Sequence, residues 1–232
     1  MPRLSTSIAL LCAALALACS TDNFGPDTAN LSGVVRDYFA DTPIADAVLK
    51  IAELPLRADT SKGNGSYLIN DLATKSTVTV LVTAAAHVET RNPPVSLGTK
   101  SVVRAMFAVA AADALRQYTA VSITPTAGAS KGVFVELKDA GGVPREGIPV
   151  ADITLVNQAQ NPVGAGPFIF GIAGDIVPNA TLAVTTAFNG RSRVGFLDVP
   201  PGTYTLRVVV AGGATFTRTV VAAADGVTLV ER

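Results

Sequence analysis

An Asn-Gly turn that leads toward an alternating strand with a tyrosine occurs twice in this sequence, far apart along the chain. The first copy has Asn64-Gly65 before Tyr67, and the second has Asn189-Gly190 before Tyr204. Asn and Gly tolerate the positive φ angles that primed hairpin turns require. Each tyrosine enters an apolar-alternating run, where its ring can be buried and its hydroxyl can reach a backbone group. The sequence therefore predicts two β units, with Tyr67 and Tyr204 in their cores.

Short alternating runs separated by Gly and Pro turns fill the chain from Asn30 onward. Spacings of about 8–12 residues between turns are typical of β-sandwiches and small barrels. We expect an all-β protein of two tandem Greek-key β-sandwiches, over residues 30–110 and 120–232. Residues 111–119 are predicted to be a linker, with no helix beyond a turn within 111–117.

Composition limits the classes of partner. Hydrophobic residues make up 49% of the chain and charged residues 16%, which favours a globular protein over a disordered one. The formal net charge is zero and no basic cluster is present. The sequence therefore predicts no nucleic-acid partner and no electrostatic attachment to an anionic membrane surface.

The first 18 residues have the features of a secretory signal peptide. Arg3 supplies a positive start, and the apolar run from Ile8 to Leu17 is too short to span a bilayer. The segment Leu15-Ala16-Leu17-Ala18-Cys19 resembles a bacterial lipobox, which implies that Cys19 becomes a lipid-bearing first residue and a membrane anchor. Ordinary cleavage at the same bond, leaving a free Cys19, is the alternative.

The cysteine count agrees with lipidation. The chain has two cysteines, and Cys12 lies in the segment that cleavage would remove. The mature protein would then have one cysteine and no internal disulfide. Residues 19–29 are predicted to be a tether. Ser20 after Cys19 resembles the outer-membrane sorting signal of Gram-negative lipoproteins, so we expect the outer membrane, or otherwise a secreted or periplasmic protein.

Three motifs in the first unit occur in the order Ser-Gly-Val-Val-x-Asp, Thr-Pro-Ile-x-x-Ala-Val and Gly-x-Gly-x-Tyr-x-Ile-x-Asp-Leu. Together they resemble the carboxypeptidase regulatory-like domain, which implies a transthyretin-like β-sandwich over residues 30–110. The sequence departs from the family at Ala86-His87, where the family has Gly followed by an aromatic residue. The second unit is similar both to this family and to bacterial Ig-like domains.

The sequence offers little that would support catalysis. His87 is the single histidine, whereas a catalytic zinc site uses two or three histidines among its protein ligands. Gly128-Ala129-Ser130-Lys131-Gly132 matches a nucleophile-elbow pattern but precedes a predicted strand instead of a helix. We therefore expect no enzyme activity, no metal and no cofactor.

Lys138 resembles the lysine that some Gram-positive surface β-sandwiches cross-link to an Asn or Asp with the help of a glutamate in a late strand. The late strand around Tyr204 to Val209 contains no glutamate. We therefore expect no such cross-link.

Carbohydrate binding is a stronger alternative, because β-sandwiches often carry it out with exposed aromatic rings. The chain has no Trp, so the candidate aromatic residues are Tyr118, Tyr38 and Phe39 after the first strand, and Phe168 and Phe170, and all but Tyr118 are the candidate partner-binding residues. Tyr38 and Phe39 form the best exposed pair, although such a pair is more often a loop anchor than a binding platform. The segment with Phe168 and Phe170 is predicted to be an extra strand or a long loop. Long loops on rigid sandwiches often carry binding surfaces.

Taken together, these patterns predict a non-catalytic envelope lipoprotein. Its sandwiches would act as an interaction module, scaffold or spacer, with an envelope protein or a glycan as partner. A carbohydrate- or peptidoglycan-binding module is the alternative, and a hydrolase has almost no support.

Overall fold

The computed structural model describes residues 27–178, 183–210 and 212–231. The predicted signal peptide, Cys19 and most of the predicted tether lie outside the described residues. Within the described ranges, no helix has the length and apolar character needed to cross a bilayer.

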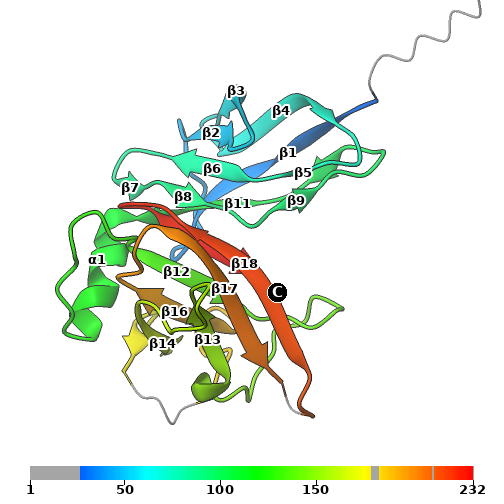
Figure 1. Ribbon diagram of the computed structural model, residues 1–232. Coiled ribbons are helices and arrows are strands. Elements are labelled where there is room, and N and C mark those ends of the chain that lie inside the picture. Colours follow the sequence, from blue (N-terminus) through cyan, green and yellow to red (C-terminus); the bar gives the residue numbers. More distant parts are fainter. Residues whose placement is uncertain (1–26, 179–182, 211, 232) are drawn as a thin grey trace, which may run out of the picture.

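Strands dominate the described residues, which confirms the all-β prediction (Figure 1). They form two packed halves, which we call the first and second sandwich, each with its own apolar core. The elements outside the strands are helix α1 (Ala111–Ala120) and one turn of 3₁₀ helix, η1 (Val150–Asp152).

The first sandwich is organised around its long first strand. Strand β1 (Thr28–Asp37) pairs antiparallel with β4 (Ser66–Ala73) on one side. On its other side it pairs parallel with β10 (Val102–Val103) and β11 (Met106–Ala110), and β11 pairs with β7 (His87–Val88). The first and last strands of this unit are thus neighbours, which closes it.

The second layer of the first sandwich contains four further strands, and a short pair lies beside it. The four are β2 (Val48–Ile51), β3 (Leu54–Thr60), β6 (Val80–Thr83) and β8 (Thr90–Arg91). The pair is β5 (Thr77–Val78) with β9 (Val95–Ser96). Inward-pointing residues of both layers form the core of this sandwich, and they include Leu31, Leu49, Ile69, Val80 and Met106.

The second sandwich has the same closure by its first and last strands. Strand β12 (Gly132–Glu136) lies parallel to β19 (Val227–Glu231) and antiparallel to β16 (Arg193–Leu197). That layer continues into β14 (Ala165–Phe170) and β15 (Ile176–Val177). The facing layer consists of β13 (Ile153–Val156), β17 (Gly202–Val209) and β18 (Thr215–Ala222).

One nine-stranded sheet runs through both sandwiches, in the order β15-β14-β16-β12-β19-β8-β6-β2-β3. Strand β19 of the second sandwich pairs parallel with β8 of the first, with Val227 opposite Thr90 and Thr228 opposite Arg91. Backbone hydrogen bonding therefore continues from one sandwich into the other.

The two Asn-Gly turns differ in conformation. At the second, Asn189 and Gly190 have φ angles of 53° and 65°, and the Arg191 amide donates to the Phe188 carbonyl at 3.2 Å, which is the predicted primed turn. At the first, only Gly65 has a positive φ, 78°, so a primed turn there is wrong. A Cβ on Gly65 would lie 2.8 Å from the Val35 carbonyl oxygen, so close approach to β1 also requires glycine.

Tyr67 and Tyr204 lie in the cores of the first and second sandwich, as predicted. The Tyr67 hydroxyl donates to the Arg104 carbonyl, and the Tyr204 hydroxyl donates to the Pro200 carbonyl, both at 2.8 Å. Burial raises the pKa of Tyr67, which keeps the hydroxyl protonated and able to donate.

The prediction that residues 111–117 form no more than a turn is wrong. Helix α1 spans ten residues, and Ala114, Gln117 and Tyr118 form its buried face. The Gln117 side chain accepts from the Ile176 amide at 2.9 Å and donates to the Gly174 carbonyl at 3.2 Å. The buried face of the helix includes a polar residue, Gln117, at a position where an amphipathic pattern would have an apolar one. The helical period is therefore hard to recognise in the sequence.

Replacing Tyr67 or Tyr204 by alanine is expected to lower the free energy of unfolding by about 3–5 kcal/mol, because each change removes a large buried ring. The phenylalanine variants keep the ring and leave one carbonyl without its donor, at a cost of about 1–3 kcal/mol. Urea denaturation measures both. Unchanged unfolding midpoints for both alanine variants would refute the assignment of these tyrosines to the two cores.

Candidate functional site: the cleft between the two sandwiches

The turn after β1 carries two aromatic side chains out of the first sandwich and into the second. Asp37 fixes this turn, because its Oδ1 accepts from the amides of Phe39 and Ala40 at 2.8 and 2.7 Å. Its Oδ2 lies 3.2 Å from Nε2 of His87 on β7. Tyr38 is held in addition by its amide, which donates to the Ala108 carbonyl at 2.9 Å.

Aromatic rings from both sandwiches meet at this turn and form a third core. We call this group the aromatic joint: Tyr38, Phe39, Phe107, Phe134, Phe170 and Phe188. The Tyr38 ring stacks on Phe134 with centroids 5.8 Å apart, and Phe39 contacts Phe134 edge-on at 6.1 Å. Such pairs stabilise beyond the area that they bury.

Tyr38 and Phe39, the sequence candidates for an exposed aromatic pair, are therefore not exposed, and of the two interpretations they act as an anchor and not as a binding platform. Their exposed fractions are 4% and 7%. Phe170 is buried as well, and Phe168 is half-buried, both on β14, so the extra-strand alternative for this segment is the one observed. The structure brings Tyr38, Phe39 and Phe170 together, because the β1–β2 turn crosses to the second sandwich.

Polar contacts also join the two sandwiches. The Val227 amide donates to the Glu89 carbonyl at 2.8 Å, beside the β8–β19 ladder. The Asn189 side chain donates to the Phe39 carbonyl at 3.2 Å. The two sandwiches are thus held together by the β8–β19 pairing, by the aromatic joint and by these polar contacts.

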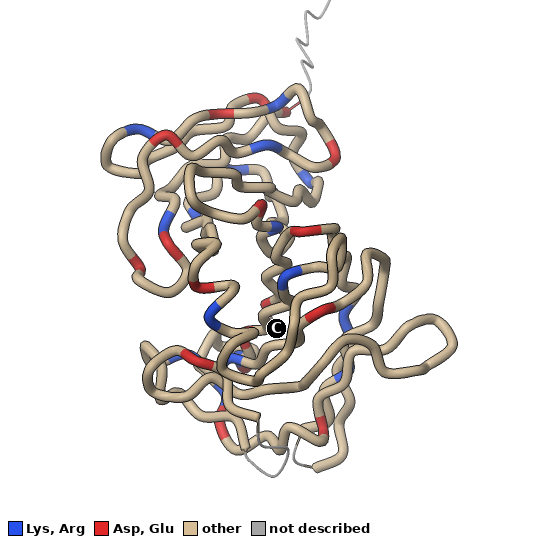
Figure 2. Tube along the Cα trace, turned by 90° about the vertical axis from the view of Figure 1, so that its left-hand side faces the viewer, with Lys and Arg blue, Asp and Glu red and all other residues tan. Residues whose placement is uncertain are grey.

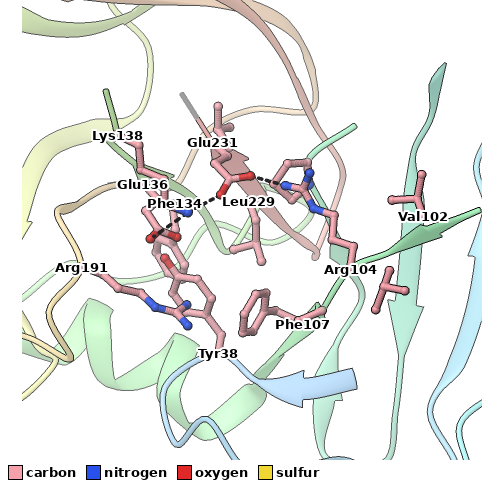
Figure 3. Close-up of a pocket in the computed structure, with 14 residues that line it drawn as sticks. Tyr38, Val102, Arg104, Phe107, Phe134, Glu136, Lys138, Arg191, Leu229 and Glu231 are labelled. Carbon is pink, nitrogen blue, oxygen red and sulfur yellow. Dashed lines mark hydrogen bonds and ion pairs between the residues drawn. The ribbon is translucent and has the colours of Figure 1, made fainter. Parts of the chain in front are cut away.

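A cleft of about 420 Å³ opens beside the aromatic joint (Figure 3). Its walls come from both sandwiches and are mainly apolar, with Tyr38, Val102 and Phe107 from the first and Phe134 and Leu229 from the second. A second pocket of about 350 Å³ shares Tyr38 and Arg191 with it and adds Asp41, Asn189 and Arg193. Charged residues of both signs gather where the two sandwiches meet (Figure 2).

Arg104 is positioned by a break between β10 and β11. Its amide donates to the Ser32 carbonyl at 2.8 Å, and its carbonyl accepts from Tyr67. A Cβ on Gly33 would lie 1.9 Å from that carbonyl oxygen, so glycine at this position lets β1 pass. The side chain is thereby aimed across the interface.

Glu231 at the end of β19 links Arg104 of the first sandwich to Lys138 of the second through one carboxylate (Figure 3). Lys138 also lies 3.3 Å from Glu136. Burial raises the pKa of Glu231, but the hydrogen bond from Lys138 and the charge of Arg104 outweigh it, and the pKa stays below its ordinary value.

This arrangement corrects the sequence analysis of Lys138. A glutamate in a late strand does lie beside Lys138, but it belongs to β19, which is the parallel neighbour of β12, and not to the strand around Tyr204. The contacts of Lys138 with Glu136 and Glu231 are ion pairs between a lysine and carboxylates. No sequence pattern reveals the pairing of β12 with the end of the chain.

Arg193 lies on the floor of the second pocket with 1% of its surface exposed. Its guanidinium stacks over the Tyr38 ring at 4.0 Å and donates one long hydrogen bond, 3.4 Å, to the Tyr38 carbonyl. Among the described residues, its Nε and Nη1 and the Tyr38 hydroxyl have no hydrogen-bond partner. Burial raises the pKa of Tyr38 to about 12, so this hydroxyl is a neutral donor at pH 7.

The remaining sequence candidates have structural roles. Ser130 is buried, and its hydroxyl donates to the Gly226 carbonyl at 2.9 Å, in a segment that leads into β12 as expected. His87 pairs with Asp37 and is half-buried, which differs from the surface position expected of a loop. Ala86 before it has a φ of 60°, a conformation that favours the glycine of the resembled family. The described ranges contain no group of three metal-ligating side chains.

The sequence matches no known family model and no curated protein. Among solved structures, it is 12% identical to the Bacillus anthracis TIE protein, with a TM-score of 0.30, over 88% of this chain and 33% of that one. It is 12% identical to GBS52, the minor pilin of Streptococcus agalactiae, with a TM-score of 0.29, over 88% and 94% of the two chains. A candidate carbohydrate-binding protein from Bacteroides uniformis is 11% identical, with a TM-score of 0.31, over 86% and 100%.

The chain thus spans about a third of the TIE protein that it matches. TM-scores this low carry no argument about function. The resemblance of the first unit to carboxypeptidase regulatory-like domains stays a prediction, and the functional argument rests on the geometry of the cleft.

Replacing Glu231 by glutamine is expected to lower the melting temperature at pH 7, because Arg104 and Lys138 lose their shared anion. A carboxylate with a lowered folded-state pKa contributes stability above its unfolded pKa, ordinarily 4.5, and loses it as the pH falls through the folded value. The difference from the unsubstituted protein should therefore narrow below about pH 4.5. Melting curves recorded between about pH 3 and pH 7 measure this difference in melting temperature, with Glu89→Gln at an exposed position as the control. A difference that stays constant down to about pH 3 would contradict the ion-pair role of Glu231.

Proposed function

We propose that this protein is a non-catalytic, lipid-anchored envelope module that serves as a scaffold or spacer and contacts its partner through the second sandwich and the cleft. The observation that carries the proposal is the continuous sheet across the β8–β19 pair. A spacer must hold its far end at a fixed distance, and two sandwiches on a free linker would not do so.

The aromatic joint supports the same role. Relative motion of the two sandwiches would expose Tyr38, Phe39 and Phe134, three large rings that are now buried. Exposing one such ring costs about 1.5–3 kcal/mol, so hinge opening would be rare. Strand β1 (Thr28–Asp37) begins at the end of the first sandwich remote from the second (Figure 1). An anchor before this point would hold the second sandwich away from the membrane.

Carbohydrate or peptidoglycan binding has less support. Three of the four candidate rings, those of Tyr38, Phe39 and Phe170, are buried in the joint, and a buried ring cannot stack on a sugar. Phe168 is half-buried against the same core. Hydrolysis has no support either, because Ser130 is buried and His87 lies with Asp37 on another element.

Spin labels on cysteines at Lys62 in the first sandwich and Gln158 in the second, in a background with both Cys12→Ala and Cys19→Ala, are expected to give one narrow distance distribution by pulsed electron paramagnetic resonance. Both positions are exposed and outside the joint. Phe39→Ala should broaden the distribution, because it removes a ring shared by both sandwiches. A distribution in the parent protein as broad as that of a flexible linker would overturn the spacer proposal.

Lipid anchoring is tested separately with Cys19→Ala. In a Gram-negative host, the parent protein should partition with membranes and show the mass of an acylated Cys19, whereas the variant should remain soluble in the periplasm or keep its signal peptide. An unmodified mature mass for the parent would rule out the lipid anchor and would leave the proposal of a secreted spacer.

Purification of the parent in mild detergent, with the Phe39→Ala variant alongside, then tests whether binding of a stoichiometric partner depends on the intact aromatic joint.

A further inference from the structure

We propose that the cleft and its adjoining pocket bind a carboxylate attached to an apolar group, with Arg191 as the residue that contacts the carboxylate. The inference rests on the proposed interaction role and names the chemistry of the partner. The ligand would be the C-terminal residue of a protein chain or a short organic acid, which share this chemistry.

The first observation is the unpaired charge of Arg193. A guanidinium keeps its proton at every physiological pH, so its charge stays buried in the folded protein. Burying a charge without an anionic partner is costly. Its cross-strand neighbour Glu136 is not within ion-pair distance of it and pairs with Lys138 instead. The faces of Tyr38 and Phe188, at 4.0 and 5.3 Å, offset only part of this cost.

The second observation is Arg191 at the mouth, which lines both the cleft and the adjoining pocket. Its side chain donates no hydrogen bond to any described residue. It stacks over the Phe107 ring at 5.0 Å, and the one carboxylate oxygen of the described residues within ion-pair distance is Asp41 Oδ1, at 3.9 Å. Stacking on a ring fixes the guanidinium plane and leaves its edge able to bind a carboxylate through two parallel hydrogen bonds.

The walls beside Arg191 define the rest of the ligand. Val102, Phe107 and Leu229 make the cleft mainly apolar where it continues from the arginine. Its carboxylates, Glu136 and Glu231, are already paired with Lys138 and Arg104. A cationic ligand would therefore have to break an existing ion pair. An anionic group would meet Arg193, which has no carboxylate within ion-pair distance among the described residues, and Arg191, whose one such contact is Asp41 at 3.9 Å. An acidic sugar would place hydroxyl groups against the apolar wall without partners.

The test is a titration of the isotope-labelled full chain in detergent, followed by nuclear magnetic resonance. The probes are N-acetyl-leucine and hexanoate, which carry both features, N-acetyl-leucinamide, which lacks the carboxylate, and glucuronate, which lacks the apolar group. The first two should shift the signals of Tyr38, Asp41 and Arg191, and the last two should bind at least about tenfold more weakly. A preference for N-acetyl-leucine over hexanoate indicates a protein C-terminus as the source, and the reverse preference a free acid.

Arg191→Gln should weaken the binding of N-acetyl-leucine by about tenfold or more, because a charge-assisted hydrogen bond is lost. Arg207→Gln is the matched control: it removes the same charge from an exposed position on β17 and should leave binding unchanged. If Arg191→Gln does not fold, Arg191→Lys keeps the charge without the planar fork and should bind with intermediate affinity.

Three outcomes would overturn the proposal: no shift with either amphipathic acid, equal binding of glucuronate, or equal loss in the Arg191 and Arg207 variants. Each leaves the spacer role intact, since that role is tested by the distance between the two sandwiches. A broad distance distribution together with normal probe binding would instead overturn the spacer proposal and support the binding-site proposal.

Discussion

The parallel pairing of β8 with β19 is the contact on which the rest of this structure depends. It joins the second layer of the first sandwich to the last strand of the chain, so that one sheet of nine strands runs through both units. The pairing also brings Glu231 to Arg104 and makes Phe107 of the first sandwich and Leu229 of the second line the same cleft. A small number of backbone hydrogen bonds thereby positions both the aromatic joint and the cleft.

The joint combines strong packing with incomplete polar pairing. Six rings meet in a closed apolar core, yet the core also contains the charge of Arg193 and the hydroxyl of Tyr38. Proteins seldom retain buried polar groups without partners, because each such group costs free energy. Arg193 lies buried against two aromatic rings, and Arg191 lines the same pocket. Two guanidinium groups that are already in position are suited to bind an anionic group. The same residues can therefore hold the sandwiches together and recognise a partner.

Some of the site could be predicted from the sequence, although its arrangement could not. Tyr38, Phe39 and Phe170 could be identified from the sequence as candidate partner-binding residues, but not as members of one buried core shared by the two sandwiches. Two adjacent aromatic residues in a turn lie outside the alternation that fills the core of their own sandwich, and this is the signal that could have indicated an interface. Arg191, just before β16, and Arg193, its first residue, gave no signal, because an arginine at the start of a strand is ordinary until the ring that it stacks on is known. Helix α1 was missed because its buried face depends on Gln117, whose partners lie on β15 and the preceding turn.

The sequence by itself determined the local features of this protein. Alternation of apolar residues indicated which side of each strand is buried, Tyr67 and Tyr204 included, and turn chemistry indicated the conformation of Asn189-Gly190, because both patterns are set by neighbours within a few residues. Only the tertiary structure decided that the two units share a sheet, that the residues after β1 enter the second core, and that Glu231 meets Arg104 and Lys138. Those contacts join residues far apart in the chain, and their energies depend on surfaces that exist only after both sandwiches have folded.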